Sequence, residues 1–143
     1  MAFAYKIDPA LGLMFYVGLD TTGAELFEAD KIASNSPLRQ PSMKIIVDIT
    51  KGDLDFDWSD IKKAYELNRK RMEGGSQLEE TAFITHNDFA NTFGDVFRML
   101  GEGMPLKLGI FSTLSDAIKW LDLSDKEAEI IEIHKELIRR LEE

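Results

Sequence analysis

The sequence predicts an α/β fold in which helices pack on a mixed, mostly parallel sheet made of an N-terminal hairpin and three further strands. Two observations carry this prediction. Strand-forming and helix-forming segments alternate three times in the second part of the chain, and such alternation implies crossover connections between parallel strands. The 143 residues are 44% hydrophobic and 30% charged, a composition that suits a single domain with one core.

The N-terminal part predicts a hairpin followed by a helix. Phe3–Ile7 and Leu13–Leu19 are rich in strand-forming residues, and the segment between them contains a proline and a glycine, which favour a turn. Apolar residues recur at helical spacing over Ala24–Ser34. Thr22 stands three residues before Glu25, which is the spacing of a capping box at the start of that helix.

Three further strands are predicted, each followed by a helix. Met43–Thr50 is a run of β-branched residues typical of a strand that is buried on both faces. The other two strands are expected over Thr81–Thr85 and Leu106–Phe111. The first intervening helix is predicted over Asp60–Met72, and the second begins near His86 and carries several phenylalanines on one face.

The C-terminal part predicts two more helices. The first runs to Leu121, and Ser124–Glu127 has the pattern of a capping box for the second. The second helix has an apolar stripe on a highly charged surface, and this stripe must bury against either this domain or a second copy. The stripe consists of Ile130, Ile133, Leu137 and Leu141. We therefore expect a domain over residues 1–123 and an appended amphipathic helix over residues 124–143.

The last strand and helix resemble the ending of a known family. Gly109–Leu121 reads GIFSTLSDAIKWL, and the small bacterial STAS- and SEC14-related proteins called SpoIIAA-like typically finish on vF-x-[ST]-x-x-x-A-x-x-W-L. The similarity extends in order to the opening hairpin, to Ile46–Thr50 and to Ala82–Ile84. The resemblance implies a STAS/SpoIIAA-like fold, and most members of that family have no assigned function.

The sequence departs from the regulatory motif of the better-known STAS relatives. Those relatives are anti-sigma-factor antagonists, and a kinase switches them by phosphorylating the serine of an Asp-Ser motif at a helix start. Here the two residue types are adjacent only in the reverse order, as in Ser59-Asp60, Ser115-Asp116 and Ser124-Asp125. We therefore expect no phosphoserine switch of that kind.

Polar residues follow each of the three later strands. Ligands of open parallel sheets bind where the carboxyl ends of strands meet helix N-termini, so these residues are expected to form one rim. A binding site there would take a small ligand or an anion, with His86 as its group that titrates near neutral pH. Alternatively, the same residues are only helix caps and a loop histidine. The candidates are Asp48, Thr50, Lys51, His86, Asn87, Asp88, Ser112 and Thr113.

The remaining features exclude several kinds of function. The chain has no cysteine, which excludes disulfides and thiolate chemistry, and its net charge of −9 argues against nucleic acid as a partner. We find no catalytic grouping, no cofactor motif and no metal-ligand pattern, and His134 is expected among glutamates on a solvated helix face. No apolar run reaches membrane-spanning length, and a cytoplasmic location is expected.

Two functions are therefore weighed. The first is a non-enzymatic regulatory or protein-interaction domain that has a protein partner and forms a homodimer through residues 124–143. The alternative is a carrier of an apolar small molecule or lipid of the SEC14 type. Its cavity would be lined by Phe89, Phe93, Phe97, Met99 and Met104.

Overall fold

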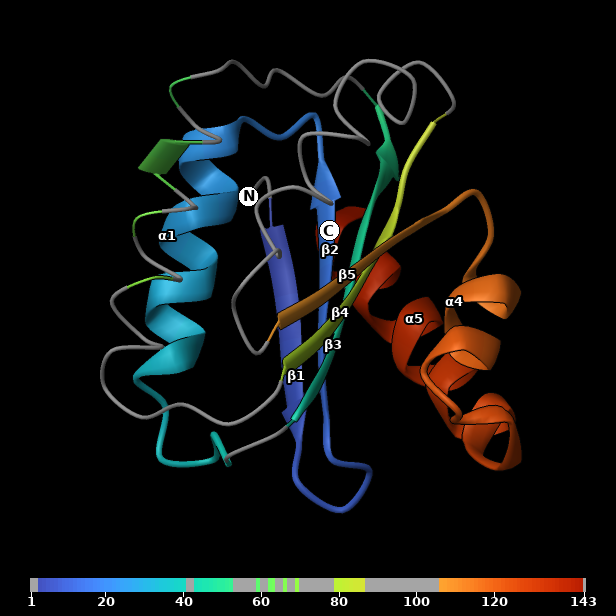
Figure 1. Cartoon of the computed structure of the whole chain (residues 1–143). Coiled ribbons are helices and arrows are strands. Elements are labelled where there is room, and N and C mark those ends of the chain that lie inside the picture. Colours follow the sequence, from blue (N-terminus) through green and yellow to red (C-terminus); the bar gives the residue numbers. More distant parts are fainter. Residues whose placement is uncertain are drawn as a thin grey trace.

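The strands form one mixed sheet in the computed structural model. The described residues are 3–40, 43–52, 79–86 and 106–142, together with Ser59, Lys62, Lys63, Glu66 and Arg69. The sheet has the order β1 (Phe3–Asp8), β2 (Leu13–Leu19), β3 (Lys44–Lys51), β4 (Glu79–Ile84) and β5 (Leu106–Phe111). β1 pairs antiparallel with β2, and the later neighbours pair in parallel (Figure 1). The prediction of a mixed, mostly parallel sheet is confirmed.

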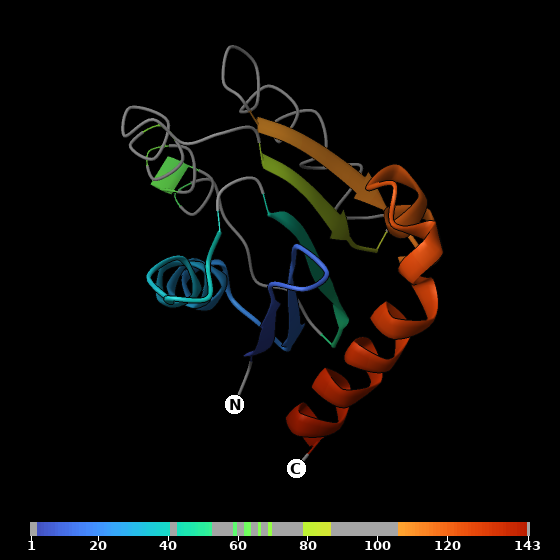
Figure 2. The same ribbon diagram turned by 90° about the horizontal axis from the view of Figure 1, so that it is seen from below.

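Helices cover both faces of this sheet. α1 (Gly23–Ser34) lies on one face, whereas α4 (Leu114–Trp120) and α5 (Glu127–Glu142) lie on the opposite face (Figure 2). Successive side chains of a strand point to opposite faces. Ile45 of β3 accordingly packs in the core beneath α1, and Ile46 packs in the core beneath α4 and α5.

The hairpin turn and the start of α1 form through local hydrogen bonds. Gly12 has a φ of 63°, in the left-handed region that favours glycine, and the Asp8 carboxylate accepts a hydrogen bond from the amide of Leu11. The Thr22 hydroxyl accepts a hydrogen bond from the amide of Glu25, and the Glu25 carboxylate accepts one from the amide of Thr22. The predicted capping box is confirmed.

The second predicted capping box is wrong. Ser124–Lys126 forms a 3₁₀ turn, and no side chain makes a capping hydrogen bond at its N-terminal end, Leu123. The physical reason is that a backbone bond takes the place of the cap, because the amide of Glu127 donates to the carbonyl of Ser124 rather than to the Ser124 hydroxyl. α5 consequently begins at Glu127, directly after this turn.

The apolar stripe of α5 packs against the chain's own sheet. Ile130, Ile133 and Leu137 are buried in the same core cluster as Phe15 of β2. The sequence left open whether this stripe buries against the domain or against a second copy, and the structure shows the former. The division of the chain after residue 123 stays a prediction, since α5 shares its core with the strands.

Parts of the predicted fold lie outside the described residues. Within the helix expected over Asp60–Met72, the described residues Lys62, Lys63, Glu66 and Arg69 are helical and exposed. The helix expected after His86, with the aromatic and methionine residues of the proposed apolar cavity, lies outside the described ranges. None of the described helices is long and apolar enough to cross a bilayer.

Candidate functional site

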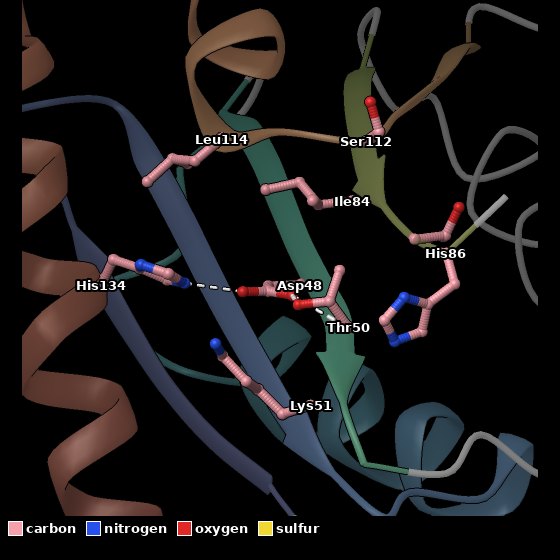
Figure 3. A pocket seen from close by; sticks show the side chains of 9 residues that line it. Asp48, Thr50, Lys51, Ile84, His86, Ser112, Leu114 and His134 are labelled. Carbon is pink, nitrogen blue, oxygen red and sulfur yellow. Dashed lines mark hydrogen bonds and ion pairs between the residues drawn. The ribbon is translucent and has the colours of Figure 1, made fainter.

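A pocket of about 330 Å³ lies where the carboxyl ends of β3, β4 and β5 approach α5. The strands end at the same edge of the sheet because they are parallel, which is the position the sequence nominated for a site. α5 adds a wall that the sequence analysis did not predict (Figure 3). The lining residues are Asp48, Thr50, Lys51, Ile84, Thr85, His86, Ser112, Leu114 and His134.

Asp48 points toward α5 because of its position in β3. It pairs in register with Ile84 of β4 and lies two residues after Ile46, so its side chain enters the face that α4 and α5 cover. Only 2% of Asp48 is exposed to solvent. A buried carboxylate is costly unless hydrogen-bond donors surround it, so the structure must supply partners for its oxygens.

Three hydrogen bonds serve the Asp48 carboxylate. Its Oδ1 atom accepts from the backbone amide of Thr50 at 2.9 Å and from the Thr50 hydroxyl at 2.6 Å. Its Oδ2 atom lies 2.6 Å from Nε2 of His134. Thr50 therefore fixes the carboxylate from within the same strand, whereas His134 links it to α5.

The pKa of Asp48 is the result of opposed effects. Burial raises the pKa, because desolvation penalises the charged form. The hydrogen bonds from His134 and Thr50, together with the charge of His134, lower the pKa and prevail, so that it falls below the ordinary value of 3.8. Asp48 is thus a carboxylate at neutral pH, and Nε2 of His134 donates the proton of their hydrogen bond.

His134 is a site residue that the sequence analysis missed. The prediction of a solvated position is wrong, because its side chain is only 19% exposed and its ring stacks on Phe15 with centroids 5.5 Å apart. A signal was present in the sequence. His134 lies four residues after Ile130 and three before Leu137, within the buried stripe of α5. A polar residue in such a stripe faces the core and needs a partner there.

His134 also changes the expectation for His86. The sequence made His86 the titrating group of the rim, but the structure places two histidines there. Figure 3 shows them on opposite sides of the pocket, with Asp48 and Thr50 between them. His86 is exposed, whereas His134 is largely buried.

The other nominated residues divide between the pocket and a helix cap. Lys51 and Ser112 line the pocket. Thr113 caps α4, because its hydroxyl accepts a hydrogen bond from the amide of Asp116, and it is not among the lining residues. Asn87 and Asp88 lie outside the described residues.

Thr85 is a second lining residue that the sequence analysis missed. It is 3% exposed, and its amide donates to the carbonyl of Phe111 at 2.9 Å. Its buried hydroxyl has no hydrogen-bond partner among the residues that the structure describes. Buried polar groups are nearly always paired, so an unpaired one marks a place where an additional partner fits. Nothing in the sequence distinguished this threonine from others in the strands.

The arrangement contains part of the grouping used in nucleophilic catalysis. A carboxylate that orients a histidine occurs in catalytic triads, where the histidine also bonds to a nucleophilic hydroxyl. Among the described residues, no hydrogen bond joins Ser112 to His134. In the same part of the chain, no group of three histidine or acidic side chains is placed to hold a metal ion.

A solved structure with the same architecture is an uncharacterised protein from the DUF3478 family of Shewanella loihica, which has a SpoIIAA-like fold. The two structures align with a TM-score of 0.55 and 17% sequence identity, over 84% of this chain and 94% of the other. The fold is SpoIIAA-like. This match confirms the resemblance at the level of the fold, and a fold does not specify a function. No protein-family model matches the chain, and no curated protein gives a significant match.

Proposed function

We propose that this SpoIIAA-like chain is a non-enzymatic regulatory or protein-interaction domain controlled by a small polar ligand in the rim pocket. One observation carries the proposal: three strand ends and α5 line the same pocket, and the contact between Asp48 and His134 joins them. A molecule bound there touches the sheet and α5 together. Its binding therefore favours one packing of α5 and changes the surface offered to a partner.

The use of the polar groups supports a binding role. Thr50 and His134 both donate hydrogen bonds to Asp48, and no hydrogen bond joins the Ser112 hydroxyl to His134. Recognition of a small molecule needs only a concave site with a few suitably placed donors and acceptors, which the lining supplies. The proposed role accordingly requires no covalent bond to be made or broken.

The proposal includes a protein partner in the cytoplasm. A homodimer through residues 124–143 is a separate prediction, and the packing of α5 restricts how it forms. Ile130, Ile133 and Leu137 are buried within the chain, so the dimer contact uses the charged outer face of α5. Exposed residues of that face include Glu132 and Lys135.

The alternative of a carrier for an apolar molecule or lipid stays a prediction. It depends on a cavity lined by residues 89–104, which lie outside the described ranges. Native mass spectrometry of the purified protein tests it, because a carrier retains lipid and an empty protein has the mass of the chain alone.

The proposed function is tested with wild-type protein and a panel of glycerol, glucose, adenosine, acetate and inorganic phosphate. We expect at least one compound to raise the melting temperature and to slow hydrogen exchange of amides in residues 127–142. His134→Phe removes the link between the pocket and α5 and is expected to abolish the slower exchange. Glu132→Gln, on the exposed face of α5, is the matched control and retains the response.

Two outcomes contradict the proposal. Binding that leaves the exchange of α5 unchanged, or no binding by any compound, removes the regulatory role of the pocket. NMR spectra of each compound detect any chemical conversion by the protein. Such a conversion shows that the proposal of a non-enzymatic domain is wrong.

A further inference from the structure

We propose that the ligand of the rim pocket is a small soluble anion that presents a carboxylate or phosphate group to Lys51. This inference rests on the proposed function and names the chemical class of the ligand. The Lys51 ammonium provides the positive charge, and the hydroxyls of Thr85 and Ser112 provide hydrogen bonds.

Lys51 lies at the edge of this pocket and has no ionic partner among the described residues. It is the last residue of β3, and its backbone carbonyl is fixed by a hydrogen bond from the amide of Asp20 at 3.0 Å. Its side chain extends toward the side of the pocket where Asp48 and His134 lie (Figure 3). Its ammonium makes no ion pair with any described residue. In a chain with a net charge of −9, the Lys51 ammonium at this concave site gives anions a local point of attraction.

The ion-pair partner of Asp48 is His134 and not Lys51. A carboxylate has about four acceptor positions, and three donors from Thr50 and His134 already occupy the two oxygens of Asp48. About one acceptor position remains, which argues against a metal cation as the ligand because such ions need several oxygen ligands. Lys51, Thr85 and Ser112 each carry a group that can donate a hydrogen bond.

Thr85 provides an independent sign of a missing partner. Its hydroxyl is buried and has no hydrogen-bond partner among the described residues, and Thr85 is one of the residues that line the pocket. An oxyanion is a strong acceptor for a hydroxyl, because hydrogen bonds to a charged oxygen are stronger than those to a neutral one. Ser112 lies at the neighbouring strand end and offers a second hydroxyl.

The size of the pocket limits the ligand. A volume of about 330 Å³ is near the lower end of the range of about 300–1,000 Å³ that small-molecule sites occupy. A water molecule takes about 30 Å³ of liquid, so the site has room for a small organic anion and several waters. The inference is therefore confined to metabolite-sized anions.

The test is an NMR titration of ¹⁵N-labelled wild-type protein at constant ionic strength with acetate, inorganic phosphate and neutral glycerol. We expect acetate or phosphate to cause saturable shifts confined to residues 48–51, 84–86, 112–114 and 134, and glycerol to cause none. Lys51→Met should weaken anion binding about tenfold, and Thr85→Val about fivefold. The matched controls, Lys31→Met on α1 and Thr81→Val in β4, should bind like wild type.

The outcomes separate this inference from the proposed function. Shifts with glycerol equal to those with the anions, or anion binding unaffected by Lys51→Met, overturn the anion class while leaving a polar ligand in place. A further titration uses vesicles of phosphatidic acid, and shifts that these vesicles produce but neither soluble anion does overturn a soluble source. Binding by no compound of this set overturns the inference, and the wider panel with its hydrogen-exchange readout then decides the proposed function. Melting curves of each variant establish that it is folded before it is scored.

Discussion

Beneath α1, the core consists of aliphatic and aromatic side chains such as Met14, Tyr16 and Ile45. Beneath α4 and α5, an equally apolar core ends at the buried carboxylate of Asp48 and its partner His134. Buried ion pairs often contribute less stability than apolar side chains of similar volume. Among the described residues, the α5 face therefore has a buried carboxylate–histidine pair, whereas the core cluster beneath α1 is apolar.

The largest loss of stability is expected in the apolar core, which is similar beneath α1 and beneath α5. Leu137 of α5 is fully buried, so Leu137→Ala should lower the free energy of unfolding by about 2–5 kcal/mol, as truncation beneath α1 would. Chemical denaturation measures this loss. Glu132→Ala, on the exposed face of the same helix, should change it by less than about 0.5 kcal/mol. A loss of similar small size for Leu137→Ala would show that α5 is not part of the core.

The sequence predicted the apolar parts of both faces, because they depend on local patterns. The run Met43–Thr50 and the stripe of α5 each reveal which residues are buried, through β-branched composition or helical spacing. The prediction of a capping box at Ser124 failed because a short backbone turn satisfied the amide of Glu127. That choice depends on how α4 leads into α5, which a local motif does not encode.

The polar site could be predicted only in part. The carboxyl ends of parallel strands meet at one edge, which brought Asp48, Thr50 and Ser112 together in the prediction. The partner of Asp48 is 86 residues away along the chain, on a helix assigned to an appended segment. Only the packing of α5 on the sheet creates that contact, and the sequence did not specify on which surface α5 would pack.

A second prediction concerns how closely α4 and β5 pack on the α5 face. A Cβ atom at Gly109 would lie 2.7 Å from the ring of Phe111 and 3.2 Å from Trp120. Gly109→Ala should therefore lower stability by about 1–3 kcal/mol through overpacking, measured by thermal or chemical denaturation. Ser115→Ala, at an exposed position of α4, is the control. An unchanged stability for Gly109→Ala would mean that this face is loosely packed outside the pocket.

The pH dependence of stability distinguishes the two faces further. The pKa of Asp48 is lowered in the folded chain, so its contribution is fully present above the ordinary value of 3.8 and is lost as the pH falls through the lower folded value. Asp48→Asn removes this contribution and should flatten the stability profile in that acidic range. Denaturation curves at pH 2–6 measure it. An identical profile for the variant and wild type would show that Asp48 is not stabilised as a carboxylate.

The smallest effect is expected at the exposed end of α5. Arg140 donates a hydrogen bond to the carbonyl of Tyr5 in the edge strand β1 and pairs with Glu136 at 2.9 Å. Because both partners are exposed, Arg140→Ala should cost no more than about 1 kcal/mol in the free energy of unfolding. A loss as large as that for Leu137→Ala would mean that this contact, rather than the apolar stripe, holds α5 in place.

The central claim is that Asp48 and His134 join the strand ends to α5 at the pocket. A double-mutant cycle of Asp48→Val and His134→Phe measures this link directly, because the second change keeps a ring against Phe15. Each single variant should lose unfolding free energy. We expect the sum of these two losses to be about 1–3 kcal/mol larger than the loss measured for the double variant. Additive effects within about 0.5 kcal/mol would contradict the account, because the two residues would then contribute to stability independently.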